Sequence, residues 1–166
     1  MFRAYVRLIV FAFGLLVGMQ IPAFIDQYHK RVDAHLSEAQ TNFDGFQRTA
    51  DRHFRGDVEA MLAHHQQSPD PVFNEDADSI RQIWLRVKLW RSEMDALSKG
   101  WLQSAWHIVF HANTDIYRET RTAFTHSIPL TQEAIIAALL LGFLAAFIVE
   151  LLLVLTARAL RIETRA

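Results

Sequence analysis

The stretch AIIAALLLGFLAAFIVELLLVLTA, residues 134–157, decides the fold of this chain. Its 24 residues carry a single charged side chain, Glu150. A helix needs about 20 mainly apolar residues to cross the hydrocarbon core of a bilayer. The stretch therefore predicts a transmembrane helix close to the C-terminal end.

A second uncharged run, LIVFAFGLLVGMQIPAFI, occupies residues 8–25 near the other end. It is shorter, but Pro22 falls near its far end, where freed backbone groups can find other partners. The preceding Arg3 and Arg7 are also typical of a secretory signal peptide, but Ile21-Pro22-Ala23 is a poor cleavage site. We therefore expect an uncleaved membrane anchor.

The charges beside the two runs predict an orientation. Arg3 and Arg7 precede the first run, and Arg158, Arg161 and Arg165 follow the second. Short basic flanks stay in the cytoplasm, so both termini are expected there. In a bacterium this places the chain in the inner (cytoplasmic) membrane. The expected segments are a cytoplasmic N-terminus (1–7), a transmembrane helix (8–25), a periplasmic segment (26–133), a transmembrane helix (134–157) and a cytoplasmic C-terminus (158–166).

Composition excludes several classes of site. The chain has 166 residues, which suits one domain, and it has no cysteine. It therefore contains no disulfide, thiolate zinc site or thiol nucleophile. The formal net charge is −1, whereas proteins that bind nucleic acid usually carry an excess of positive charge, so we expect no nucleic-acid partner.

The first half of the middle segment has helical periodicity. Apolar residues recur at spacings of three and four: Tyr28, Val32, Leu36, Ala39, Phe43, Phe46, Ala50, Phe54, Val58 and Met61. This pattern predicts a helix with a narrow apolar seam that continues from the first transmembrane helix. Gly45 and Gly56 are expected to mark bends, and residues 68–74, which begin Ser-Pro-Asp-Pro, predict a turn.

The returning half has a similar seam. It runs through Ile83, Val87, Trp90, Met94, Leu97 and Trp101, and continues past Gly100 to Ala105, Val109, Ala112 and Ile116. The predicted fold is all-α, with two transmembrane helices flanking a long extracytoplasmic antiparallel helical hairpin that resembles a coiled coil. The alternative is a compact bundle broken at Gly56 and Gly100.

Small residues form a stripe on each predicted transmembrane helix. Gly14 and Gly18 make a GxxxG pattern, and Ala134, Ala138, Gly142 and Ala146 recur every four residues. Small residues let helix backbones approach closely in lipid. The two stripes either pack against each other within the chain or bind a second copy or another membrane subunit.

Glu150 continues the second stripe by one more step of four. An ionisable side chain at this depth usually faces protein and has a partner. Three interpretations of Glu150 are open. It is protonated or reaches toward Arg3 or Arg7, it pairs with a basic residue of another subunit, or it takes part in proton transfer.

The histidines give a metal hypothesis. His107 and His111 lie four residues apart on one helical face, a spacing that can hold a metal. In an antiparallel hairpin His107 falls opposite His35, which would supply a third nitrogen. The other interpretation is a solvated polar face.

Aromatic residues widen the apolar arc of the returning half beyond what one neighbouring helix covers. These residues are Trp106, Phe110, Tyr117 and Phe124. They are either buried in a bundle of three or four helices or form a face for oligomerisation or a partner protein. Tyr117 and Phe124 alternatively approach the lipid headgroups.

The sequence also resembles a family of small proteobacterial inner-membrane proteins of unknown function. The resemblance covers nearly the whole chain and rests on specific runs. These are Gln20-Ile-Pro-Ala-Phe-Ile-Asp-Gln-Tyr28 with Arg31-Val32, Gly45-Phe-Gln-x-Thr-Ala-Asp-Arg-x-Phe-x-Gly-Asp57, and His64 with Ser68-x-Asp70 and Phe73. The resemblance implies an inner-membrane location and no particular activity.

No phosphate-binding loop, catalytic triad order or carboxylate pair occurs in the sequence, so we expect no enzyme and no cofactor. The expected role is an accessory, scaffolding or assembly subunit that contacts the lipid bilayer and either itself or a larger membrane protein complex. The alternative is a periplasmic module that senses pH or binds metal through its histidines.

Overall fold

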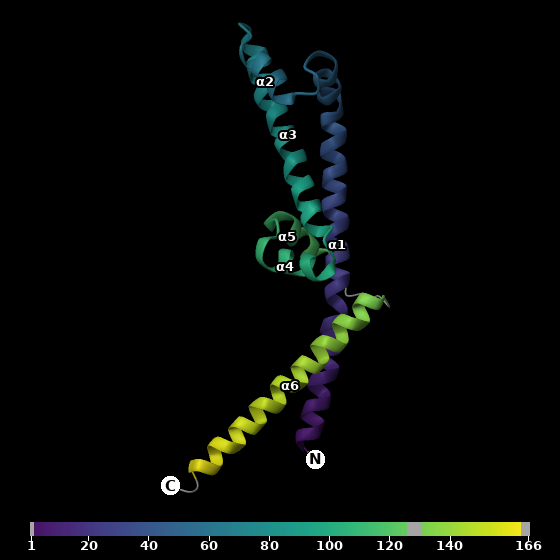
Figure 1. Cartoon of the computed structure of the whole chain (residues 1–166), viewed down its shortest axis with the longest axis vertical. Coiled ribbons are helices and arrows are strands. Elements are labelled where there is room, and N and C mark those ends of the chain that lie inside the picture. Colours follow the sequence, from purple (N-terminus) through teal and green to yellow (C-terminus); the bar gives the residue numbers. More distant parts are fainter. Residues whose placement is uncertain (1, 126–130, 164–166) are drawn as a thin grey trace. The chain divides into compact units, whose positions relative to one another are not determined.

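The computed structural model describes the backbone of residues 2–125 and 131–163 and the side chains of residues 3–125 and 131–156. This part of the chain is helical and contains no strand (Figure 1). Its helices are α1 (Phe2–His53), α2 (Val58–Gln66), α3 (Pro71–Leu97), α4 (Trp101–His111), α5 (Thr114–Thr122) and α6 (Gln132–Glu163). The all-α prediction is confirmed. The side chains of Arg158, Arg161 and Arg165, which predict the orientation of the C-terminus, lie outside the described side chains.

Two of the helices, α1 and α6, are long and apolar enough to cross a membrane. Their most apolar windows have mean hydropathies of 2.3 and 2.8, and only 11% and 17% of those windows are buried. Such exposure of apolar side chains is expected of helices that face lipid. Pro22 does not interrupt α1.

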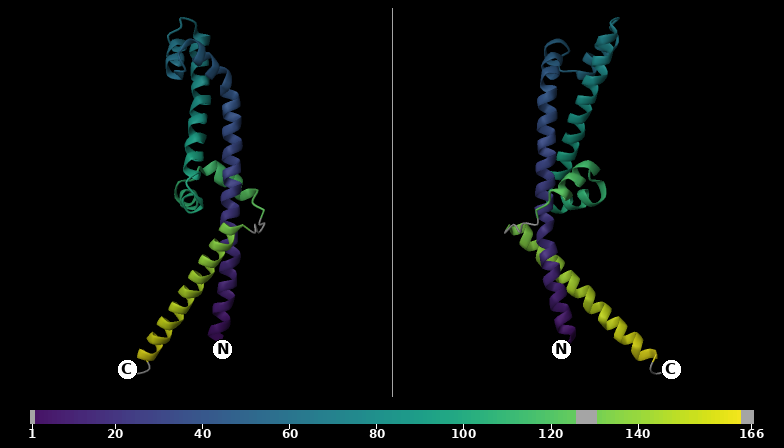
Figure 2. Two further views of the ribbon diagram at one scale, coloured as in Figure 1. Left: turned by 45° about the vertical axis from the view of Figure 1, so that its right-hand side comes forward. Right: turned by 180° about the vertical axis from the view of Figure 1, so that it is seen from behind.

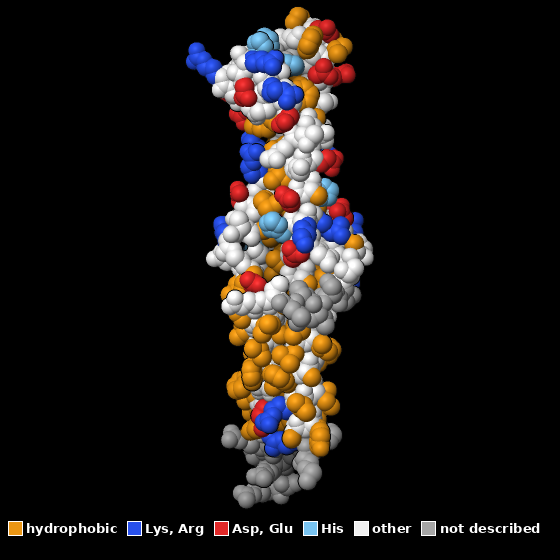
Figure 3. Space-filling view, turned by 90° about the vertical axis from the view of Figure 1, so that its right-hand side faces the viewer, with side chains coloured by type: hydrophobic (Ala, Val, Ile, Leu, Met, Phe, Trp, Pro, Cys, Tyr) orange, Lys and Arg blue, Asp and Glu red, His pale blue; other side chains and the backbone are white. Residues whose placement is uncertain are grey.

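The chain divides into two compact units. Unit 1 comprises Met1–Gln27 and Thr120–Ala166, and unit 2 comprises Tyr28–Glu119. Helix α1 belongs to both units. On the face drawn in Figure 3, hydrophobic side chains cover unit 1 almost continuously, whereas charged side chains are spread over unit 2.

Unit 2 is built around the α1 segment 28–53 and α3, which run side by side in opposite chain directions (Figures 1 and 2). Their facing sides supply most of its core, namely Tyr28, Val32, Ala39, Phe43, Ala50, Ala77, Ile80, Val87, Trp90 and Leu97. Five of these residues belong to the seam predicted for the first half of the segment. The periodicity therefore identifies the buried side of α1 correctly.

The turn between α1 and α2 falls at Arg55 and Gly56. Both residues have positive φ angles, 55° and 83°, so the chain leaves the helix through a left-handed conformation. Glycine adopts this conformation without steric cost, which explains why Gly56 ends α1. Gly45, by contrast, lies within the uninterrupted helix, so the bend expected there is not a break.

Helix α3 begins at Pro71, three residues before the end of the turn predicted over 68–74. Asp70 caps it, and its carboxylate accepts a hydrogen bond of 3.0 Å from the backbone N–H of Val72. Proline suits the first position of a helix because its missing N–H would have no partner there. The two prolines therefore mark the start of the helix rather than a long turn.

The returning half is not one helix. It breaks at Gly100, which has a φ angle of 104°, and again at Ala112, so it forms α3, α4 and α5. Each break changes which residues face inward. Ile108 is buried, whereas Val109, assigned to the seam in the sequence analysis, is 70% exposed. The continuation of the seam past Gly100 is therefore wrong at this position.

Candidate functional site

Unit 2 contains a polar cluster, buried at Tyr28 and Glu93, that joins three segments of the chain. Its members are Tyr28 on α1, Glu93 on α3, His107 on α4 and Asn113, which follows α4. The Tyr28 hydroxyl donates a short hydrogen bond to Oε1 of Glu93. The same oxygen lies 3.0 Å from Nε2 of His107. We call these four residues the Tyr28 junction.

Asn113 completes the junction through its backbone. Its N–H donates to the Tyr28 hydroxyl at 3.0 Å and lies 3.5 Å from Oε1 of Glu93. Its side chain turns the other way and caps α5, accepting hydrogen bonds from the N–H groups of Asp115 and Ile116. A single residue thus ends the connection from α4, begins α5 and fixes both to α1.

Burial makes this cluster electrostatically unusual. Tyr28 is fully buried and Glu93 is 7% exposed. Burial, together with the bond to Glu93 and its negative charge, raises the pKa of Tyr28 well above the ordinary tyrosine value, and the Asn113 N–H opposes this only in part. Tyr28 therefore keeps its proton and acts as a donor to the carboxylate.

A buried carboxylate is costly unless several donors satisfy it. Glu93 has a hydroxyl, an imidazole and a backbone N–H around one oxygen. Chemically, the junction offers one carboxylate oxygen as the shared hydrogen-bond partner of a phenol, an imidazole and a backbone N–H. It also locks the position of α4 against α1 and α3.

The three histidines expected to bind metal are not brought together. His107 contacts Glu93, and His111 stacks on His107 with ring centroids 6.1 Å apart. His35 instead lies 3.2 Å from a carboxylate oxygen of Glu119, and its ring packs on Trp90. Within the described residues, no group of three His, Cys, Asp or Glu side chains is placed to hold a metal ion.

The small-residue stripes meet within unit 1. A Cβ atom built on Gly18 would lie 2.6 Å from Cα of Ala138, and one on Gly14 would lie 2.9 Å from Cα of Gly142. Ala134, Ala138 and Ala146 are buried along the same contact. Of the two interpretations left open by the sequence, the structure has the stripes packed against each other within the chain.

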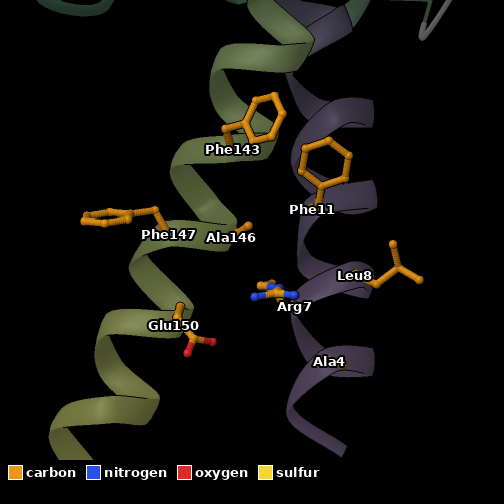
Figure 4. A pocket seen from close by; sticks show the side chains of 8 residues that line it. All are labelled: Ala4, Arg7, Leu8, Phe11, Phe143, Ala146, Phe147 and Glu150. Carbon is orange, nitrogen blue, oxygen red and sulfur yellow. The ribbon is translucent and has the colours of Figure 1, made fainter. Parts of the chain in front are cut away.

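Glu150 also has a partner within unit 1. Its carboxylate lies 3.0 Å from the guanidinium of Arg3, and both side chains are about half exposed. An open cavity of about 600 Å³ adjoins this pair between α1 and α6 (Figure 4). It is lined by Ala4, Arg7, Leu8, Phe11, Phe143, Ala146, Phe147 and Glu150. Glu150 is thus ion-paired with Arg3 and lines a cavity that Arg7 also lines.

The four aromatic residues expected to form one face are divided. Trp106 and Phe110 lie together on α4, with ring centroids 4.2 Å apart, and are 64% and 59% exposed. Tyr117 is 40% exposed on α5. Phe124 instead packs edge-on against Phe24 in unit 1.

Sequence reasoning missed the Tyr28 junction, although one signal for it exists. Glu93 follows Trp90 by three residues and precedes Leu97 by four, so it lies on the apolar seam of α3. A carboxylate on a buried face requires a partner. The seam on α1 contains a tyrosine that can supply one, but the sequence does not show that these residues meet.

Comparison with known proteins assigns a family without an activity. No curated protein and no solved structure matches the chain. One family model, described as "Protein of unknown function (DUF2937)", matches residues 2–162 and so includes the Tyr28 junction and both apolar helices. The chain therefore belongs to this family of proteins of unknown function.

Proposed function

We propose that the chain is a non-enzymatic accessory or scaffolding subunit of the bacterial inner membrane. In this proposal α1 and α6 span the bilayer, both termini are cytoplasmic, and residues 26–133 lie in the periplasm. The basic residues beside the two apolar runs support this orientation. The role is to hold a folded helical unit at the membrane surface for contact with other subunits.

The observation that carries the proposal is the Tyr28 junction. Tyr28 comes three residues after the apolar run 8–25 in the same helix, and it is bonded to Glu93 and Asn113. The hydrogen bonds of this fully buried side chain therefore tie α3 and the start of α5 to α1 directly beyond the proposed span. A junction of this kind suits a scaffold, because it gives the helices of the folded unit a defined arrangement.

Two leucines on α3 are the side chains through which we propose protein contacts. Leu85 and Leu89 lie one helical turn apart and are 51% and 43% exposed. Exposed apolar neighbours in a predominantly charged surface are typical of sites that bind another protein.

The test is purification of the full chain from its native membrane in mild detergent, followed by mass spectrometry of co-migrating proteins. The double variant Leu85→Ser/Leu89→Ser is compared with Val72→Ser/Phe73→Ser, which removes two exposed apolar residues at the start of α3. We expect a stoichiometric partner, or a defined oligomer, that the first variant loses and the second retains. A monomer with no partner in every sample would overturn the proposal.

The His107–Glu93 pair favours a second candidate, a periplasmic pH sensor. The two side chains are 20% and 8% exposed, and Tyr28 and His111 are the titratable side chains in contact with the pair. Protonation of His107 would place a charged donor on the carboxylate, whereas protonation of Glu93 would remove the acceptor of the junction. Metal sensing would need three donors, so the sensing proposed here is of protons.

The sensor candidate predicts that the thermal unfolding temperature of unit 2 depends on pH, because the charges of histidine and carboxylate side chains change with pH. This dependence should be lost in His107→Gln and retained in His64→Gln, which changes an exposed histidine. Identical pH profiles for the parent chain and His107→Gln would eliminate the sensor.

A further inference from the structure

Helix α4 presents an apolar face that the described part of the chain leaves uncovered. Its exposed side chains are Leu102, Trp106, Val109 and Phe110, with exposed fractions between 59% and 70%. These positions lie on one side of the helix, because they are spaced by four, three and one residues. The opposite side carries Ser104 and Ile108, which are buried, and His107, which contacts Glu93.

The composition of α4 suits lipid better than a charged protein surface. Its eleven residues, WLQSAWHIVFH, contain no Asp, Glu, Lys or Arg. Tryptophan and phenylalanine are favoured at the boundary between lipid headgroups and acyl chains, where amphipathic helices lie in the plane of the membrane.

The residues that connect α4 to α1 also indicate lipid as the partner of α4. His111 ends α4, and two residues later the N–H of Asn113 bonds to Tyr28 at 3.0 Å. Tyr28 follows Ile25, the last residue of the apolar run, by three residues, or about 4.5 Å along a helix. The chain directly after α4 is therefore bonded to a residue that follows the apolar run by only three positions in the sequence.

We infer that α4 is an interfacial helix whose face of Leu102, Trp106, Val109 and Phe110 inserts into the headgroup layer of the bilayer. This inference goes beyond the accessory role and rests on the proposal that the run 8–25 spans the membrane. It assigns the bilayer, rather than a second copy of the chain, as the partner of Trp106 and Phe110.

The test uses the absence of cysteine, which makes single-cysteine labelling specific. Nitroxide labels are placed at Val109→Cys, Val72→Cys and Leu16→Cys in the full chain, in nanodiscs of phosphatidylethanolamine and phosphatidylglycerol. All three positions are exposed, so labelling should not disturb the fold. Collisions of each label are measured with oxygen, which concentrates in lipid, and with a water-soluble nickel complex.

We expect the labels at Val109 and Leu16 to collide preferentially with oxygen and the label at Val72 to collide preferentially with nickel. If position 109 behaves like position 72 while position 16 is in lipid, the interfacial helix is wrong and the span stands. If position 16 is also in water, the membrane proposal fails, and the inference fails with it.

Two further readouts separate lipid from protein. Dipolar broadening at position 109 that disappears on dilution with unlabelled chain would show a second copy on the face and overturn the inference. Lipids brominated near the headgroup should quench the tryptophan fluorescence of the parent chain, and this quenching should fall in Trp106→Phe. Equal quenching of the two proteins would contradict the inference.

Discussion

Helix α1 makes two contacts of opposite character along its length. Near its N-terminal end, Gly14 and Gly18 let the backbone of α6 approach because they have no side chains. Further along, Tyr28 fills its site completely and bonds to Glu93 and Asn113. The first contact requires that glycine has no side chain, and the second requires the ring and hydroxyl of the tyrosine side chain. Added groups should therefore disrupt unit 1, and deleted groups should disrupt unit 2.

The largest effect is expected from Glu93→Ala. It leaves the Tyr28 hydroxyl and the His107 ring without their common partner. Each buried polar group that is left unsatisfied costs about 1–3 kcal/mol, and here two groups lose their partner. Thermal unfolding followed by tryptophan fluorescence measures this in unit 2 alone, because all four tryptophans lie there. Asp95→Ala, an exposed carboxylate on the same helix, should change little, and equal losses in both variants would contradict the assignment.

The next largest effect should come from Gly18→Leu. Its Cβ alone would lie 2.6 Å from the Cα of Ala138, so the two backbones must separate, at a cost of about 1–3 kcal/mol or more. Chemical cross-linking between Phe11→Cys and Phe143→Cys reports the contact, since these rings are 5.1 Å apart. The yield should fall about tenfold, which corresponds to 1.4 kcal/mol. Gly45→Leu is the matched control, because nothing lies within 4 Å of a Cβ there, and it should retain the parent yield.

Tyr28→Phe sharpens the comparison because it removes one oxygen and keeps the ring. The expected loss is about 1.5–3 kcal/mol, the range for hydrogen bonds to charged groups. The raised pKa of Tyr28 also predicts a pH dependence. The unfolded chain loses this proton above pH 10, the ordinary tyrosine value, while the folded chain keeps it. The contribution of Tyr28 to stability is thus fully present below pH 10 and declines as the pH rises further. Alkaline unfolding curves of the parent and Tyr28→Phe that remain parallel above pH 10 would refute this.

The smallest effect is expected at the end of unit 1. Glu150→Gln removes the ion pair with Arg3, and both side chains are about half exposed. Arg3 precedes the proposed span and can turn toward water when its partner is lost, so the cost should be small. The cross-linking yield between positions 11 and 143 should therefore change less than in Gly18→Leu. A loss as large as that of Gly18→Leu would show that Glu150 determines the contact.

The two contacts also differ in how far the sequence predicts them. Small residues spaced by four on two apolar runs predict a close contact, and only its partner stays open. The Tyr28 junction depends on residues 28, 93, 107 and 113 meeting across two breaks in the returning half. The backbone conformation at Gly100 and Ala112 determines whether these residues come into contact. The spacing of apolar residues does not reveal this conformation. For the same reason the seam correctly identifies Trp90 and Leu97 as buried but fails at Val109.

The close approach of Gly18 to Ala138 has a consequence for how the chain is made. Synthesis proceeds at about 5–20 residues per second, so residue 138 follows residue 18 by roughly 6–24 seconds. If the two helices span a bilayer as proposed, the glycine face of α1 lacks its partner helix during this interval and can bind other small-residue helices. Insertion of α6 then makes the contact intramolecular, which favours it over contacts with separate helices. The order of synthesis thus predicts that this face is open to other helices for some seconds and covered afterwards.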